Sequence, residues 1–340
     1  MPAKTSNGAT WEWECDPRAE RRETVLNWGI IGTRGYAAKS AVPGVKASEK
    51  GEIVAVLGRD PDRTKDFAGE HDIEVAVTGM DEFLAAPGLD AVWIVSPTFL
   101  HHQQGMAALK AGKHVLLEKP LAPTAAEAWE LVETARETGV VLATGYQGRY
   151  VPGHQAMRKL ISDGAIGDVT VARTYYGVHR DGPPPEWRQH RTEARWGALA
   201  DIGTHHLDLL RMLLGEVADA HGLTGHQLGF ETEDVGAATL RFESGVLATL
   251  TVTVNVWKMA TRVEVHGTKG ALVALDTNPA GAGTVTLITE DGERDVTGDR
   301  PASIWAAEVD AIEAAAAGQD VSYATGEDGA RNIEILERIG

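Results

Sequence analysis

The fold is decided by one stretch near the N-terminus, which reads Val25-Leu26-Asn27-Trp28-Gly29-Ile30-Ile31-Gly32-Thr33-Arg34-Gly35-Tyr36-Ala37. A short apolar run leads into a glycine-rich turn and then into a helical pattern. That order is the one a dinucleotide-binding turn requires, because the helix N-terminus offers free backbone N–H groups to a pyrophosphate. Gly32 and Ala37 fit the pattern G-x-G-x-x-A, but Arg34 stands where the middle glycine is expected. A plain tight turn is the alternative at this point.

The alternation of short apolar runs with helical stretches continues to about residue 145. Continuous apolar strands between helices indicate a parallel sheet that is buried on both faces. The first part of the chain is therefore predicted to be a doubly wound α/β domain of the Rossmann type. The expected strands are 25–31, 52–57, 91–96, 114–117 and 140–144, and the expected helices are 37–46, 61–68, 102–111 and 125–137.

The pattern changes in the second half, where strands dominate after helices expected at 154–162 and 201–214. Segment 248–256 alternates apolar residues with threonines, which predicts an antiparallel strand with one covered face. Glycine-containing turns at 243–245 and 291–292 predict hairpins, and the last helices are expected at 304–317 and 328–339. The predicted organisation is a tail at 1–23, a dinucleotide-binding domain at 24–145, and a substrate-binding and oligomerisation domain at 146–340.

Composition limits the classes of partner. The 340 residues suffice for about two domains, and the formal net charge of −17 disfavours nucleic acid and anionic membrane surfaces. Cys15 is the single cysteine, so neither an internal disulfide nor a cysteine-based metal site is expected, and a reducing cytoplasm fits. The sequence has no apolar stretch of the ~18–20 residues that span a bilayer. A soluble, cytoplasmic protein without a metal is predicted.

The end of the second expected strand bears on the choice of cofactor. In Rossmann domains an acid at this point binds the ribose 2′-hydroxyl of NAD, whereas a nearby arginine accommodates the 2′-phosphate of NADP. This chain has Gly58 where the acid is expected, and Arg59 follows. The sequence therefore favours NADP over NAD. The alternative is that Arg59 is solvated and that Asp60 only caps the helix that Pro61 begins.

Two further motifs carry groups suited to proton transfer. Lys119 follows the strand 114–117, at the sheet edge where open α/β sheets bind ligands, and Pro120 comes directly after it. Asp201 and His205 are four residues apart in a helical pattern and so share one face, where a carboxylate can orient an imidazole. An ordinary histidine pKa of ~6.5 would suit either direction of proton transfer. Taken singly, a surface lysine, a helix-capping aspartate and a packed histidine are the alternatives.

Together these motifs make the chain similar to the glucose-fructose oxidoreductase / inositol dehydrogenase (Gfo/Idh/MocA) family, over most of its length from about Leu26. The turn, the triplet Glu118-Lys119-Pro120 and the pair Asp201-x-Gly-x-His205 stand in the family's order, and segments 95–101 and 145–152 also match. The resemblance implies a Rossmann domain joined to an α+β domain with a large, open, mostly antiparallel sheet. It also implies that Lys119, Asp201 and His205 form the catalytic set. Arg34 departs from the family pattern and puts the usual pyrophosphate contact in doubt.

The predicted activity is that of an NAD(P)-dependent oxidoreductase, a dehydrogenase or reductase that acts on CH–OH groups of a sugar, cyclic polyol or related carbohydrate. An NAD-dependent glycosidase and a non-catalytic, NAD(P)-binding sugar sensor are the alternatives. The expected cofactor contacts are Gly29, Gly32, Thr33, Arg34, Gly35, Tyr36, Ala37, Arg59, Ser96, Pro97, Thr98, His101, Glu118 and Lys119. The expected substrate contacts are Lys119, Arg149, Tyr150, Trp187, Arg188, Asp201 and His205.

Segment 179–196 is expected to line the substrate side of the site. It carries four arginines in an otherwise acidic chain, and the prolines at 183–185 forbid a helix there. Trp187 and Trp196 are suited to stacking on a sugar ring, and a solvated loop is the alternative. An open sheet with one bare face also predicts self-association, so a homodimer or homotetramer is expected.

Overall fold

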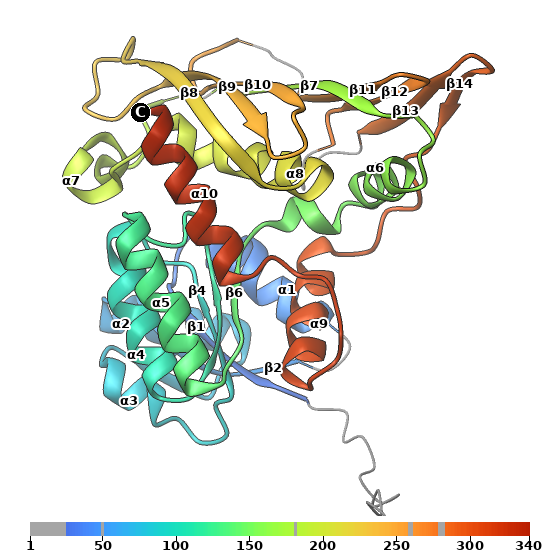
Figure 1. Ribbon diagram of the computed structural model, residues 1–340. Coiled ribbons are helices and arrows are strands. Elements are labelled where there is room, and N and C mark those ends of the chain that lie inside the picture. The colour runs from blue at the N-terminus through green and yellow to red at the C-terminus, as the bar shows by residue number, and fades with distance from the viewer. Residues whose placement is uncertain (1–24, 49–50, 180–181, 258–260, 278–282) are drawn as a thin grey trace, which may run out of the picture.

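The computed structural model describes residues 25–48, 51–179, 182–257, 261–277 and 283–340 (Figure 1). The tail expected at 1–23, with Cys15, lies outside the described residues, as do Arg180 and Asp181 of the arginine-rich segment. Two sheets organise the rest of the chain, one of six strands and one of eight.

The six-stranded sheet has the order β3-β2-β1-β4-β5-β6, and all its neighbouring strands are parallel. The order reverses between β1 and β4, which is where sheets of this kind bind dinucleotides. The prediction of a doubly wound α/β domain is confirmed. The strands are β1 (Asn27–Ile31), β2 (Glu52–Leu57), β3 (Val75–Val77), β4 (Ala91–Ile94), β5 (His114–Leu117) and β6 (Leu142–Thr144).

Helices cover this sheet on both sides (Figure 1). The first begins as a π-helical turn, η1 (Ala37–Ala41), and continues as α1 (Val42–Ala47). The others are α2 (Pro61–His71), α3 (Met80–Leu84), the 3₁₀ turn η2 (Thr98–Leu100), α4 (His101–Lys110) and α5 (Ala125–Thr138). Neither β3 nor α3 was expected from the sequence. The apolar run of β3 has only three residues, between Glu74 and Thr78, and α3 has only five.

The eight-stranded sheet has the order β14-β13-β12-β11-β7-β10-β9-β8, and helices lie on only one of its sides among the described residues (Figure 1). Its strands are β7 (Val169–Gly177), β8 (Val217–Gly225), β9 (Val235–Phe242), β10 (Leu247–Thr253), β11 (Arg262–Gly267), β12 (Gly270–Leu275), β13 (Thr284–Thr289) and β14 (Gly292–Asp295). The helical elements of this half are η3 (Gln147–Tyr150), α6 (Pro152–Ser162), η4 (Glu186–Gln189), α7 (Arg191–Ala194), the π-helical turn η5 (Leu199–Gly203) and α8 (Thr204–Leu214). The expectation of a large, mostly antiparallel sheet is confirmed.

Strand β10 has the predicted alternation but not entirely the predicted pairing. Ala248, Leu250 and Val252 are buried, whereas Thr249 is exposed, so one face is covered as expected. The strand is antiparallel to β9 but parallel to β7. Alternation reports which face of a strand is buried, and it carries no information about the direction of the neighbouring strand.

The last two helices, α9 (Ile304–Ala316) and α10 (Gly326–Ile339), return to the N-terminal sheet (Figure 1). Val309 and Ile312 of α9 are fully buried in the cluster that contains Trp28 of β1. Ala330 and Ile333 of α10 belong to the cluster around β4, β5 and α5. The apolar core of the N-terminal half therefore includes residues far beyond position 145. A helical period shows that a stripe is buried, but not which surface covers it.

Candidate active site

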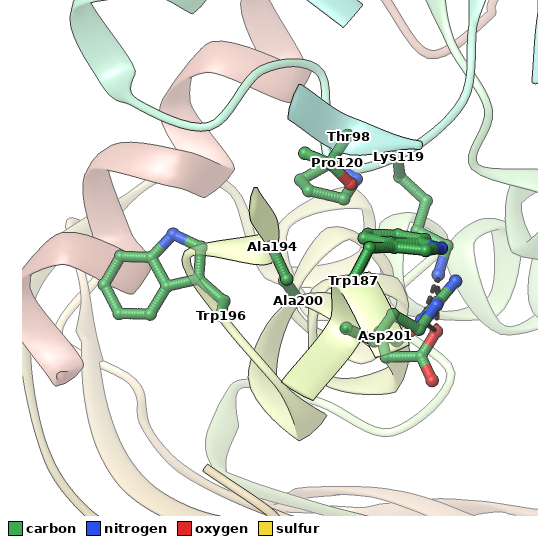
Figure 2. A pocket seen from close by; sticks show the side chains of 9 residues that line it. Thr98, Lys119, Pro120, Trp187, Ala194, Trp196, Ala200 and Asp201 are labelled. Carbon is green, nitrogen blue, oxygen red and sulfur yellow. Dashed lines mark hydrogen bonds and ion pairs between the residues drawn. The ribbon is translucent and has the colours of Figure 1, made fainter. Parts of the chain in front are cut away.

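The proposed catalytic residues come from both halves of the molecule. Lys119 lies two residues after the end of β5, and Asp201 lies in the π-helical turn η5 that precedes α8. The Lys119 ammonium donates a hydrogen bond to the backbone carbonyl of Asp201, and Lys119 Nζ is 3.5 Å from Asp201 Oδ1. Arg188 of η4 forms a second ion pair with the same carboxylate oxygen. The structure thus brings Lys119, Asp201 and Arg188 together (Figure 2).

These residues border a small, partly open pocket, which is lined by residues from both halves of the chain. In Figure 2 Lys119 extends toward Asp201 and the Trp187 ring lies beside them, whereas Trp196 lies at the other end of the lining. Trp187 contacts Phe99 of η2 edge-to-face, with ring centroids 6.3 Å apart, and the Arg188 guanidinium lies 4.8 Å from the Trp187 ring centroid. The lining residues are Thr98, Lys119, Pro120, Trp187, Arg188, Ala194, Trp196, Ala200 and Asp201.

His205 lies one helical turn after Asp201, with its ring edge-to-face against Tyr146 at a centroid distance of 6.0 Å. Its Nδ1 atom is buried and has no hydrogen-bond partner among the described residues. Burial, followed by the charge of Lys119, lowers the pKa of His205 well below its ordinary value, although Asp201 opposes the shift. The imidazole is therefore neutral near pH 7, where it can accept a proton. An unperturbed pKa, which would suit both directions, does not apply here.

Lys119 is also shifted toward its neutral form. Burial lowers the pKa of its ammonium, and the nearby Arg188 adds to this effect, whereas Asp201 and Glu118 act in the opposite direction. A lysine whose pKa is lowered exchanges its proton more easily at working pH.

The glycine-rich turn has the backbone that a dinucleotide requires. Gly32 and Gly35 have φ values of +128° and +42°, which favour glycine. A Cβ atom on Gly32 would lie 2.8 Å from Val95 Cγ2, so a side chain there would have to displace its neighbour. Arg34 does not share this constraint, because it has no positive φ, and its side chain is exposed. The departure at Arg34 therefore leaves the turn intact, and the residues present fit a dinucleotide.

Three positively charged side chains lie near the end of β2. Arg63, Arg34 and Arg59 all lower the pKa of the Asp60 carboxyl, after the hydrogen bond that the Arg63 backbone N–H donates to it. Asp60 caps α2 through that bond at 2.9 Å. An acid cannot replace Gly58 without rearrangement, because a Cβ atom there would lie 2.1 Å from Thr64 Oγ1.

His101 connects two loops at the carboxyl edge of the parallel sheet. Its ring nitrogens lie 2.8 Å from the carbonyl oxygens of Pro120 and Ser96, and the ring is buried. Ser96 Oγ donates to Gln104 Oε1 at 2.5 Å. The structure therefore holds the loop before α4 against the loop that carries Lys119, and the polar atoms of the His101 ring are already engaged.

Arg149 and Tyr150 were expected to contact the substrate, but the structure places Arg149 in a different set of contacts. Its guanidinium donates to both carboxylate oxygens of Asp208, at 2.8 and 2.6 Å, and lies 3.0 Å from Asp328 Oδ2. Tyr150 is packed near Glu308, and burial together with that carboxyl raises the pKa of its hydroxyl. Asp208 and Asp328, which engage Arg149, were not identified from the sequence.

The arginine-rich segment contributes unequally to the cavity. Arg188 lines it, whereas Arg191 donates to the Glu231 carbonyl oxygen and Arg195 pairs with Glu337. Among the described residues, no helix is long and apolar enough to cross a membrane, and no group of three or more His, Cys, Asp or Glu side chains is placed to hold a metal ion.

Comparison with known proteins identifies the family of both halves of the chain. Residues 26–146 match the model of the oxidoreductase family with an NAD-binding Rossmann fold, and residues 154–273 match the GFO/IDH/MocA C-terminal domain. The 1,5-anhydro-D-fructose reductase of Ensifer adhaerens is 36% identical over 89% of this chain and 91% of its own. The trans-1,2-dihydrobenzene-1,2-diol dehydrogenase of Bos taurus is 29% identical over 74% of each chain.

Solved structures agree in fold. An aldose-aldose oxidoreductase from Caulobacter crescentus, complexed with glycerol, aligns with a TM-score of 0.84 and 26% identity over 92% of this chain and 96% of its own. A levoglucosan dehydrogenase in complex with NADH aligns with a TM-score of 0.83 and 24% identity over 92% and 95%. The class that the fold and the site define is an NAD(P)-dependent oxidoreductase. The chain belongs to the Gfo/Idh/MocA oxidoreductase family.

The contacts of Arg149 generate a prediction that separates a structural role from substrate binding. Arg149→Ala leaves the buried Asp208 carboxylate without its main partner, which should lower the free energy of unfolding by about 3–5 kcal/mol. Urea unfolding would measure this loss. Lys159→Ala breaks the exposed pair with Asp163 and should cost at most about 1 kcal/mol. A raised KM with unchanged stability would instead support contact with the substrate.

Proposed function

We propose that this oxidoreductase interconverts a hydroxyl and a ketone on a sugar, cyclic polyol or related carbohydrate. The observation that carries the proposal is the pairing of Lys119 with Asp201 in a cavity at the carboxyl edge of the parallel sheet, with neutral His205 one helical turn away. The names of the relatives, which are a 1,5-anhydro-D-fructose reductase and an aldose-aldose oxidoreductase, support a carbohydrate substrate.

The chain's own residues supply positioning and a route for the proton. The nicotinamide, when bound, accepts or gives up the hydride. In the oxidation direction, His205 is the proposed acceptor of the substrate hydroxyl's proton: its imidazole is neutral, and its buried Nδ1 has no hydrogen-bond partner among the described residues. Lys119 donates a hydrogen bond to the same oxygen and stabilises its developing negative charge. Asp201 holds the Lys119 ammonium in place through their ion pair.

Arg188 and Trp187 form the substrate side of the proposed site. Arg188 is held by the Asp201 carboxylate and by the face of the Trp187 ring, so both side chains are ordered where they border the cavity. A flat aromatic ring beside fixed hydrogen-bond donors is suited to one face of a sugar. The contact between Trp187 and Phe99 joins this wall to the N-terminal half.

Variants of the proposed catalytic residues test the function. His205→Ala should lower kcat by about 10²–10⁴-fold while dinucleotide binding stays near normal, because only the proton acceptor is lost. Lys119→Ala should be at least as damaging. Arg188→Ala should mainly raise KM. The assay follows nicotinamide absorbance with cyclic polyols, aldoses, ketoses and anhydrosugars, using both NAD and NADP.

A matched control is His102→Ala, which removes a histidine on α4 that pairs with Glu130 at the surface. It should leave turnover unchanged. Full activity of a destabilised His205→Ala protein would contradict the catalytic assignment and favour a sugar-binding sensor. Turnover without net consumption of free cofactor would instead identify a glycosidase.

We also propose that NADP is bound at least as tightly as NAD. Three arginines lie near the end of β2: Arg34, Arg59 and Arg63. At Gly58, where an NAD-selecting acid would stand, Thr64 leaves no room for a side chain. An arginine cluster of this kind suits the 2′-phosphate. In this proposal Arg34, which stands where the family has glycine, contacts the 2′-phosphate that distinguishes NADP from NAD.

The cofactor proposal predicts that Arg34→Ala and Arg59→Ala each weaken NADP by about 10- to 100-fold and NAD much less, because a charge-assisted hydrogen bond to phosphate is lost. Isothermal titration calorimetry with both dinucleotides would measure the difference. Arg136→Ala, which removes a surface arginine on α5, is the control and should change neither affinity. Equal losses for NAD and NADP would remove these arginines from the 2′-phosphate site.

We also propose that the protein forms a homodimer or homotetramer through the bare face of its eight-stranded sheet. A cytoplasmic location is proposed as well, because the sequence has a single cysteine. Val171 of β7 and Leu247 of β10 are neighbours on this face and are 44% and 46% exposed. Next to them, Arg173 and Arg262 flank the Glu264 carboxylate, which is 1% exposed. A patch of this composition is suited to covering by a second copy of the chain.

Light scattering at micromolar concentration tests the oligomer. The wild type should have the mass of a dimer or tetramer, and the double change Val171→Glu with Leu247→Glu should reduce it to a monomer, because each copy would bring like charges to the interface. A monomeric wild type would contradict the proposal.

A further inference from the structure

Two consecutive polar side chains, Thr232 and Glu233, are buried in the loop between β8 and β9, where they are 3% and 2% exposed. Neither has a part in the reaction proposed above. Burying a polar group costs free energy unless it is hydrogen-bonded, so the partners of these two side chains show what the loop holds in place.

Glu233 holds the start of the turn that carries Asp201. Its Oε1 atom accepts hydrogen bonds from the backbone N–H groups of Gly197 at 2.7 Å and Leu199 at 3.0 Å. The N–H group between them, that of Ala198, donates to the backbone carbonyl of Glu233 at 2.8 Å. Three successive N–H groups are therefore bonded to one residue, and they lie at the beginning of η5.

Gly197 connects Glu233 to Asp201 directly. While its N–H donates to the Glu233 carboxylate, its carbonyl oxygen accepts from the Asp201 N–H at 2.9 Å. Only glycine allows this approach, because a Cβ atom on Gly197 would lie 1.9 Å from the Glu233 carbonyl oxygen. The backbone carbonyl of Asp201 in turn accepts from the Lys119 ammonium. A movement of Glu233 would thus be passed to the backbone that Lys119 contacts.

Thr232 holds the segment that carries Arg188. Its hydroxyl donates to the backbone carbonyl of Arg188 at 2.7 Å, and the N–H group of Glu231 donates to the carbonyl of Gln189 at 3.0 Å. None of the residues of η4 is buried, so this short turn has no core of its own and its place depends on such contacts. The Arg188 guanidinium then pairs with Asp201.

The loop that makes these contacts is anchored in the eight-stranded sheet. The Asp234 N–H donates to the Gly225 carbonyl oxygen at the end of β8 at 3.0 Å, and the Val254 N–H donates to the Asp234 carbonyl oxygen at 2.9 Å. Adjacent residues of one sheet-anchored loop therefore hold the two partners of the ion pair between Arg188 and Asp201.

We propose that Thr232 and Glu233 are positioning residues with separate effects on the reaction. Thr232 sets the place of Arg188 on the substrate side. Glu233 sets the place of Asp201 and, through it, of the Lys119 ammonium. The proposal rests on the roles proposed above for Arg188 and Lys119. Ordering a binding residue changes KM, whereas ordering a group that acts in the transition state changes kcat, so these two neighbours have different kinetic signatures.

The first test replaces Thr232. Thr232→Val removes the hydroxyl at nearly constant volume and should raise KM roughly 3- to 10-fold, as expected for one lost neutral hydrogen bond, with kcat near that of the wild type. Thr232→Ser keeps the hydroxyl and should restore KM. In an Arg188→Ala background Thr232→Val should raise KM much less, because the positioned side chain is absent. An unchanged KM, or an equal rise in both backgrounds, would overturn the role of Thr232.

A matched control is Thr144→Val. Thr144 of β6 is also buried, and its hydroxyl also donates to a backbone carbonyl in a distant segment, that of Thr325, at 3.0 Å. The control variant should lower Tm without raising KM. An equal rise in KM for Thr144→Val would show that general loosening of the fold is the cause, and would overturn the positioning role.

The second test replaces Glu233 and reads hydrogen–deuterium exchange together with kcat. Glu233→Leu removes the acceptor of two N–H groups, so the amides of Gly197 and Leu199 should exchange faster. The kcat value should fall by about 10- to 100-fold, because small misplacements of catalytic groups cost about this much. Glu233→Gln keeps an acceptor oxygen and should restore slow exchange and most of kcat. If Glu233→Leu does not fold, Glu233→Asp gives the same test, since its shorter side chain withdraws the carboxylate.

The outcomes of the second test separate the steps of the argument. Unchanged exchange would overturn the role of Glu233, and faster exchange with unchanged kcat would overturn its link to Lys119. Failure of the proposed function would be distinct, since Lys119→Ala would then retain activity while the faster exchange in Glu233→Leu remained.

Discussion

The ion pair between Lys119 and Asp201 is the interaction on which the site depends, because its partners belong to different halves of the molecule. Lys119 is fixed by the parallel sheet through β5, and Asp201 is fixed by the turn that begins α8. Their contact requires the two sheets to be held in one relative position, and the buried helices α9 and α10 supply that constraint by packing on the N-terminal half. Arg188 joins the same carboxylate, so three elements converge on one side chain.

A helix or strand was predictable from the sequence wherever its own residues show a clear hydrophobic pattern. Continuous apolar runs identified the parallel strands except β3, whose three residues lie between the polar Glu74 and Thr78. The alternation in β10 gave its buried face correctly. Its parallel pairing with β7 and the packing of α9 on the N-terminal half depend on partners far away in the chain, and a local pattern has no access to them.

The candidate site was likewise predictable only in part. The family resemblance implied that Lys119 and Asp201 share one site, and Arg188 was expected on its substrate side. The structure brings these three residues together. The sequence did not reveal that Asp208 and Asp328 pair with Arg149. Nor did it reveal that Glu308 of α9 lies near Glu118. Those relations come from long-range packing, which decides the neighbours of a charged side chain and therefore its pKa.

The return of α9 and α10 to the N-terminal half has a consequence for synthesis on the ribosome. The chain completes β6 at residue 144, but the cluster around Trp28 also needs Ile312, and the cluster around β5 also needs Ile333. The parallel sheet is therefore translated early and remains without part of its apolar cover until the eight-stranded sheet has followed. Nascent chains of this protein expose that surface until α9 and α10 have been made, and a stop before residue 304 removes core residues from both halves: Ile312 and Ile333 from the first, Leu336 from the second.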